Sequence, residues 1–295
     1  MIIGIILSII VAIFWSLGEV NYSKLSKNYD RPNVYMYTYL IRAIIYILVV
    51  LIFNRALFGT FKMDVFLVVL PIIVCDLFAT YVVNIAVLNG KLTVVSPIMA
   101  AYPVLDIILG AILLKENIGF VEAFLASVIA ISIIFLAIYQ KKSKKAPHPV
   151  RGIIFAIGYM LLVGFSTYFE KSIYINNLTV YDLYYYKGIV YTFASIVFAL
   201  AVIITPFKMK PFDKQIIKGC GYAPIGNILY SFALSFSAMT IVAPISSLYS
   251  VITNILSRIV LKERIRIRER ICIATIIICT ILLIVFGFIL WIMMI

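Results

Sequence analysis

The sequence is poor in charge. Only 13% of its 295 residues are charged, whereas 64% are hydrophobic. A soluble domain of this length needs far more charge to cover its surface, so the composition excludes a soluble protein. The formal net charge of +13 does not indicate nucleic-acid binding, because the lysines and arginines lie in short breaks between long apolar blocks.

Residues of metal, redox and nucleotide chemistry are also scarce. The one histidine lies in a proline-containing linker, and the four cysteines are scattered without redox or metal-ligand spacing. No ATP-binding P-loop motif is present. We therefore predict no cofactor and no metal site. The N-terminal stretch MIIGIILSII has no basic segment before it, so we interpret it as a retained helix and not as a removable signal peptide.

The chain is rich in apolar blocks long enough to cross a bilayer, about 20 residues each. Turn or charge signals separate them into ten predicted helices, at about 3–23, 33–54, 65–88, 92–114, 118–139, 151–174, 181–205, 219–238, 241–261 and 270–293. We predict an all-α, polytopic membrane protein with ten transmembrane helices, located in the cell membrane. The basic, proline-containing linker 140–150 separates a first five-helix repeat, 1–139, from a second, 151–295.

The two halves repeat the same sequence features in the same order. VVSPIMAAYPVLDIILGAILLKENI at 94–118 returns as IVAPISSLYSVITNILSRIVLKERI at 241–265, 147 residues later. Gly-Ile-Ile opens both halves, at Gly4 and Gly152, and one cation lies inside the second helix of each, Arg42 and Lys187. Because each half has an odd number of helices, the repeats are predicted to be inverted, which is typical of alternating-access transporters.

These features resemble the drug/metabolite transporter superfamily, specifically its ten-helix EamA-like branch. The resemblance covers essentially the whole chain. It rests on Trp15, the two intramembrane cations, Pro97 and Pro244, and the acidic residue closing the same helices, Glu116 and Glu263. The second half departs from the pattern, since Val163 aligns with Trp15.

The resemblance implies a ten-helix bundle with a pseudo-two-fold axis and a central cavity. Helices 3–23, 65–88 and 92–114 and their counterparts 151–174, 219–238 and 241–261 would line the cavity, and 118–139 and 270–293 would lie at the periphery. The resemblance also implies that both termini are cytoplasmic. The distribution of charge predicts the opposite. Of the 22 basic residues outside the apolar blocks, 18 follow the odd-numbered helices and 4 follow the even-numbered ones, which places both termini outside.

Charged residues inside membrane helices are costly and usually face a cavity or a partner. Four are candidates for intramembrane pairing or ion coupling: Arg42, Asp76, Lys187 and Arg258. Glu19 and Asp106 are candidates for binding a cationic substrate group or for proton coupling, because burial favours the neutral form of a carboxyl group. We expect Glu170 to form an interfacial ion pair with the adjacent Lys171.

Aromatic and amide groups complete the predicted site. Trp15, Tyr81, Tyr102 and Tyr249 could form an aromatic box that attracts an amine by cation–π interaction. Packing or membrane-belt roles would equally explain each ring. Further candidate substrate-binding residues on the same helices are Asn84, Asn227, Ser247 and Asn254.

Several repeated features have simple structural interpretations. The Lys115-Glu116 and Lys262-Glu263 pairs are explained by snorkelling and by capping of the following helix. Pro97 and Pro244 fit helix starts or flexible points near the cavity, whereas Pro103 and Pro224 lie further inside helices.

We hypothesise a secondary transporter of a small polar metabolite that bears an amine, such as an amino acid, a polyamine or a choline-like compound. Its partners would be this substrate and the lipid bilayer, and we expect no nucleic-acid partner. Transport could be coupled to a proton or another ion. An integral-membrane enzyme acting on a lipid-linked substrate is an alternative. It would need acid/base or metal-binding residues that converge at one membrane face, whereas the acidic residues are dispersed along this sequence. A non-transporting lipid scramblase or scaffold is another, but it would not require polar residues in matched central helices.

Overall fold

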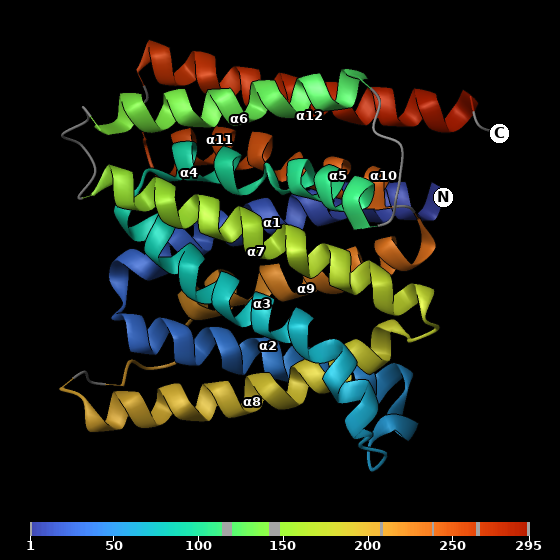
Figure 1. The fold of residues 1–295 in the computed structure, drawn as a ribbon. Helices are drawn as coiled ribbons and strands as arrows, with labels where there is room; N and C mark the ends of the chain where they lie inside the picture. Colours follow the sequence, from blue (N-terminus) through green and yellow to red (C-terminus); the bar gives the residue numbers. More distant parts are fainter. Residues whose placement is uncertain are drawn as a thin grey trace.

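The computed structural model describes residues 2–113, 120–141, 148–206, 209–237, 239–263 and 266–293 (Figure 1). The first half contains α1 (Ile2–Asn28), α2 (Arg31–Phe53), the short 3₁₀ helix η1 (Arg55–Leu57), α3 (Met63–Asn89), α4 (Leu92–Met99), α5 (Tyr102–Leu113) and α6 (Phe120–Lys141). The second half contains α7 (Pro149–Ile175), α8 (Val180–Ile204), α9 (Lys214–Phe236), α10 (Met239–Ser247), α11 (Tyr249–Val260) and α12 (Ile267–Met293). The described residues form no strand, which confirms the predicted all-α class.

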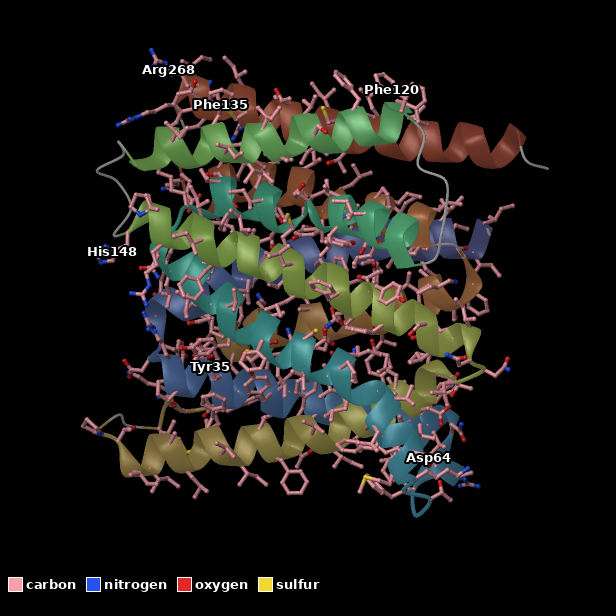
Figure 2. All side chains as sticks on the ribbon, viewed as in Figure 1. Tyr35, Asp64, Phe120, Phe135, His148 and Arg268 are labelled. Carbon is pink, nitrogen blue, oxygen red and sulfur yellow. The ribbon has the colours of Figure 1, made fainter. Side chains whose placement is uncertain are left out.

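The outer surface suits a bilayer. Helices α1, α2, α3, α7 and α8 are each long and apolar enough to span a membrane on their own. Large apolar side chains cover the outside, including Phe120 and Phe135, which project outward from α6 and are 86% and 48% exposed (Figure 2). Apolar groups exposed in this way are stabilised by lipid and not by water.

Helix packing follows a pseudo-two-fold axis between the halves. Helix α1 packs along α9, and α3 packs along α7, so the first span of each half meets the third span of the other. On the axis, α2 packs against its counterpart α8, and α6 against α12. Figure 1 shows α6 and α12 forming one outer layer and α2 and α8 lying on the opposite side of the bundle. This exchange of partners is what two inverted five-helix repeats require.

The repeated Gly-Ile-Ile motif marks two close helix contacts. A Cβ atom on Gly152 would lie 2.6 Å from the backbone nitrogen of Gly90, at the end of α3. A Cβ atom on Gly4 would lie 2.1 Å from the Oγ atom of Ser237, at the end of α9. Ser237 follows Gly90 by 147 residues, so the two contacts are symmetry counterparts. The first residues of each repeat therefore need glycine because the other repeat leaves no room for a side chain.

The fourth and ninth spans are not continuous helices, contrary to the sequence prediction. Helix α4 gives way to α5 at Ala100–Ala101, and α10 gives way to α11 at Leu248. Both junctions contain i→i+3 bonds at matching positions: Ala101 N–H to the Ile98 carbonyl (3.2 Å), and Leu248 N–H to the Ile245 carbonyl (3.2 Å). Short 3₁₀ segments of this kind interrupt an α-helix without leaving its donors unpaired.

The two junctions have different local causes. In the first half, Pro103 supplies no N–H, so the turn before it cannot close as an α-helix, and Pro103 becomes the second residue of α5. In the second half, Ser250 replaces that proline. Ser250 Oγ donates to the Ser247 carbonyl (3.1 Å), and Ser247 Oγ donates to the Pro244 carbonyl (2.6 Å). Side-chain bonds of this type compete with the backbone and bend helices. Pro97 and Pro244 lie inside α4 and α10, not at their starts.

The connections divide between the two ends of the bundle. Those between α1 and α2, α3 and α4, and α11 and α12 lie at one end, and those between α2 and α3 and between α7 and α8 lie at the other (Figure 1). Arg268 and His148 lie at the first end, and Asp64 lies at the second (Figure 2). Both the start of α1 and the end of α12 lie at the second end (Figure 1). The lysine- and arginine-rich connections are thus gathered opposite the chain termini.

Two predictions about helix ends need revision. Glu263 does not cap the following helix α12; its carboxylate contacts the first residues of α4 in the other repeat. Lys171 does not pair with Glu170 but donates to the carbonyl oxygens of Leu234 (2.9 Å) and Ser237 (3.0 Å), at the end of α9. Adjacent residues on a helix do not face each other, so Glu170 and Lys171 point in different directions. Lys115 and Glu116 lie outside the described residues.

Candidate functional site

A cavity of about 120 Å³ lies at the interface of the two repeats. Its lining residues come from α1, α3 and α5, from α7, α9 and α11, and also from α2 and α8. The described parts of α6 and α12 contribute none, in line with the peripheral position that the family resemblance implies. The helices bearing Arg42 and Lys187, α2 and α8, also reach the cavity, which was not predicted from the sequence.

One side of the cavity is a cluster of charges around Lys187. Its Nζ atom lies 2.7 Å from Asp76 Oδ2 and 3.8 Å from Glu170 Oε2, and its side chain is 2% exposed. Ser166 Oγ donates to Asp76 Oδ1 (2.8 Å), and the Tyr174 hydroxyl donates to Glu170 Oε1 (2.9 Å). One buried cation is therefore held by two carboxylates, one from each repeat, and the hydrogen bonds satisfy the remaining oxygens.

A second group of cavity residues is aromatic. The Trp15 ring lies 5.0 Å from the Tyr230 ring, 5.6 Å from Tyr249 and 6.5 Å from Tyr102, measured between ring centroids. The Trp15 indole Nε1 donates to Asn227 Oδ1 (2.9 Å), which fixes the orientation of both side chains. Residues of both repeats thus form a rigid aromatic wall despite the missing second tryptophan.

Two further charged groups line the cavity. Glu19 lies one helical turn after Trp15 on α1, and its Oε2 atom accepts a hydrogen bond from Ser96 Oγ (2.5 Å). Arg42 Nη1 on α2 donates to Thr80 Oγ1 (2.6 Å). Within the described ranges, neither Glu19 nor Arg42 has an oppositely charged side chain within 4.0 Å.

The structure brings most of the predicted residues together around the cavity. Of the candidates proposed from the sequence, those that line it are Trp15, Glu19, Arg42, Asp76, Tyr102, Lys187, Asn227 and Tyr249. The other six candidates lie elsewhere.

Three of these six lie on helices that line the cavity but do not face it. Tyr81 is 45% exposed on the outer surface of α3, where its ring stacks on Tyr35 at 5.5 Å, so it is not part of the aromatic wall. Asn84 is fully buried and does not line the cavity, and its Nδ2 donates to Ser26 Oγ (2.9 Å). Asp106 is 2% exposed and does not line the cavity, and its carboxyl oxygens have no hydrogen-bond partner among the described residues.

The remaining three serve packing or face outward. Ser247 bonds its own helix at the junction between α10 and α11. Asn254 Nδ2 donates to the Thr93 carbonyl (2.8 Å), the acceptor that Pro97 leaves free four residues later because proline has no N–H. Arg258 is exposed near the end of α11, not buried among helices. None of the three belongs to the cavity lining.

Several cavity residues were missed. Glu170 was assigned to an interfacial pair because Lys171 follows it, and Tyr22, Tyr159 and Tyr230 were not distinguished among 20 tyrosines. Tyr22 could have been found, since it lies three residues after Glu19 and therefore on the same helix face. Tyr230 could have been found in the same way, since it lies three residues after Asn227. Tyr159 carries no such signal, because no residue of α7 was among the predicted substrate-binding candidates.

Comparisons with known proteins agree with this architecture. No curated protein matches the sequence. Sixteen chains of solved structures match the fold. One of them, a crystal structure of a protein 13% identical in sequence, aligns over 94% of each chain with a TM-score of 0.65. The sequence matches the EamA-like transporter family twice, over residues 2–138 and 150–286, one match for each repeat. The resemblance drawn from the sequence is therefore confirmed, and the chain belongs to the EamA-like transporter family, in the drug/metabolite transporter superfamily.

Proposed function

We propose that this membrane transporter carries a small polar metabolite bearing an amino group, and that the central cavity is its binding site. Family membership supports transport in general but says nothing about the substrate. The choice of an amine rests on the side chains of the cavity, and above all on Glu19.

Glu19 is the carboxylate available to a cationic ligand. Asp76 and Glu170 already share Lys187, whereas Glu19 faces only neutral hydroxyl groups, those of Ser96 (2.5 Å), Thr253 and Tyr249. An unpaired carboxylate inside a membrane protein is unfavourable unless a cation or a proton neutralises it. A substrate ammonium group would supply that charge.

The aromatic wall lies on the same side as Glu19. Trp15 precedes Glu19 by four residues, so both side chains project from one face of α1 into the cavity. Tryptophan and tyrosine rings attract cations through their faces, by about 0.5–2 kcal/mol for each contact. A carboxylate next to such rings is a site for an ammonium or alkylammonium group.

The fold supports alternating access as the mechanism. The cavity lies between two inverted repeats, and the helices broken near it, α4/α5 and α10/α11, are related by the pseudo-two-fold axis. Discontinuous helices at the repeat interface are a recurring feature of transporter binding sites. Rocking of one repeat against the other would expose the same site to each side of the membrane in turn.

The test is binding followed by transport. Purified protein is screened for thermal stabilisation by a panel of amines, amino acids and choline-like compounds, and hits are tested by counterflow in proteoliposomes. Glu19→Gln and Trp15→Ala should each weaken binding of the hits at least tenfold. Tyr81→Ala is the matched control, since that ring lies outside the cavity. Unchanged binding in both cavity variants, or no hit among amine-bearing compounds, would refute the proposal.

A further inference from the structure

We infer that Arg42 forms an anion subsite in the same cavity, so that the substrate is a zwitterion with an anionic group as well as the ammonium group. This inference rests on the proposed function and narrows its substrate class. It favours amino-acid-like compounds over polyamines and choline-like cations.

Arg42 is a cavity-lining cation that has no carboxylate within 4.0 Å among the described residues, although Asp76 acts on it electrostatically from further away. Its guanidinium donates a hydrogen bond from Nη1 to Thr80 Oγ1 (2.6 Å) and lies 6.0 Å from the centroid of the Tyr191 ring. Its Nε atom is buried and has no hydrogen-bond partner among the described residues. Buried N–H groups are nearly always paired, and a buried charge without a partner is more costly still.

The pseudo-symmetry shows what Arg42 lacks. Lys187 is its counterpart in the second repeat, and Lys187 contacts Asp76 and Glu170. The positions matching these carboxylates on the Arg42 side are Ala223, 147 residues after Asp76, and Tyr22, 148 residues before Glu170. Both residues line the cavity, and neither carries a negative charge. Lys187 therefore has two carboxylates within 4.0 Å, whereas Arg42 has none at that distance among the described residues.

The carboxylates of the Lys187 cluster are not free to serve Arg42. Asp76 directs its two oxygens to Lys187 and Ser166, at 2.7 and 2.8 Å. Glu170 is held by Lys187 and by the Tyr174 hydroxyl. Thr80, which accepts from Arg42, donates its own hydroxyl proton to the Asp76 backbone carbonyl (2.8 Å). A ligand is thus the remaining source of an anionic partner within the described site.

Guanidinium chemistry indicates the kind of group that fits. Arginine presents its donors in a planar fork that matches a carboxylate, a sulfonate or a phosphate and is charged at any physiological pH. Glu19, Arg42 and Tyr159 line the same cavity, so the two charges face one space. A compact zwitterion could therefore place its ammonium group at Glu19 and its anionic group at Arg42.

Matched pairs of ligands test the subsite. Each pair compares a zwitterion with the amine that lacks its acid group: glycine betaine and choline, ornithine and putrescine, tyrosine and tyramine. Taurine and phosphocholine extend the comparison to sulfonate and phosphate. In at least one pair, the wild-type protein should bind the zwitterion at least tenfold more tightly than the amine. Arg42→Gln should weaken binding of the zwitterion and bring the two affinities of that pair within about twofold. Arg42→Lys retains the charge and should keep part of the preference.

The outcomes separate this inference from the proposed function. If amines bind as tightly as their zwitterions in the wild-type protein, and Glu19→Gln still weakens them, the anion subsite is wrong and the amine site stands. If no zwitterion and no amine binds, both fail. If Arg42→Gln does not fold, the ratio of zwitterion affinity to amine affinity, measured in the wild-type protein and in Arg42→Lys, still tests the anion subsite.

Discussion

Glu263, at the end of the ninth span, caps the helix that begins beside Thr93 in the fourth span. Its Oε2 atom accepts hydrogen bonds from the Thr93 backbone N–H (2.9 Å) and hydroxyl (3.0 Å), and its Oε1 atom accepts from the Leu92 N–H (3.1 Å). Lys27 approaches the same carboxylate at 3.8 Å. A helix N-terminus favours a negative charge, so this contact joins the two repeats at the basic end of the bundle.

Replacing Glu263 should therefore loosen this connection. Glu263→Gln removes the charge but keeps the size, and we expect it to destabilise the protein by about 1–2 kcal/mol, the range measured for loss of a helix cap. Thermal unfolding in detergent measures the change. Asp30→Asn is the matched control, because Asp30 stands at the N-cap of α2 without a side-chain cap bond. Equal effects of the two substitutions would show that the Glu263 contact contributes little.

The Lys187 cluster should behave as one unit. Lys187→Met leaves Asp76 and Glu170 without their cation and should destabilise the protein by about 3–5 kcal/mol. Adding Asp76→Asn removes one of the unpaired charges, so the double variant should be more stable than Lys187→Met alone. A double-mutant cycle followed by thermal unfolding measures this coupling. Additive effects of the two substitutions would contradict the assignment of a mutual ion pair.

The glycine contact between the repeats should tolerate no side chain. Gly152→Ala places a Cβ atom 2.6 Å from the Gly90 nitrogen and 2.7 Å from its Cα atom, so α7 and α3 must separate. We expect a loss of about 1–3 kcal/mol, as for other overpacked sites. Gly221→Ala is the control: no atom lies within 4 Å of its Cβ position, and alanine favours a helix, so stability should stay equal or rise. Comparable losses in both variants would mean that the close approach does not limit stability.

The sequence predicted the spans and their symmetry because apolar length and duplicated residues are local features. It did not predict the junction at Leu248, where no proline stands and two serine hydroxyls bend the helix. The side of α3 that faces the cavity could have been predicted from the sequence. Asp76, Ala79, Thr80 and Val83 follow the i, i+3, i+4, i+7 spacing of one helix face, and all four line the cavity. Tyr81 is off that face and could have been excluded.

The partners of the charges depended on packing between distant segments and could not be read from the sequence. Lys187 meets carboxylates 111 positions earlier, at Asp76, and 17 positions earlier, at Glu170. No spacing rule distinguishes these from Asp106, which is not among the residues lining the cavity. The pseudo-symmetry made Arg42 and Lys187 counterparts, but only the structure showed that their surroundings differ.

Membrane orientation follows from the ends of the bundle. The connections after the odd-numbered spans hold most of the basic residues, and they lie opposite the start of α1 and the end of α12 (Figure 1). Short basic connections favour the cytoplasmic side, so both termini should face outward. Alkaline phosphatase, which is active only outside the cytoplasm, should be active when fused after Ile295 or inserted after Thr60, and inactive when inserted in the linker 140–150. The reverse pattern would show that the inward-facing termini implied by the family resemblance prevail over the charge bias.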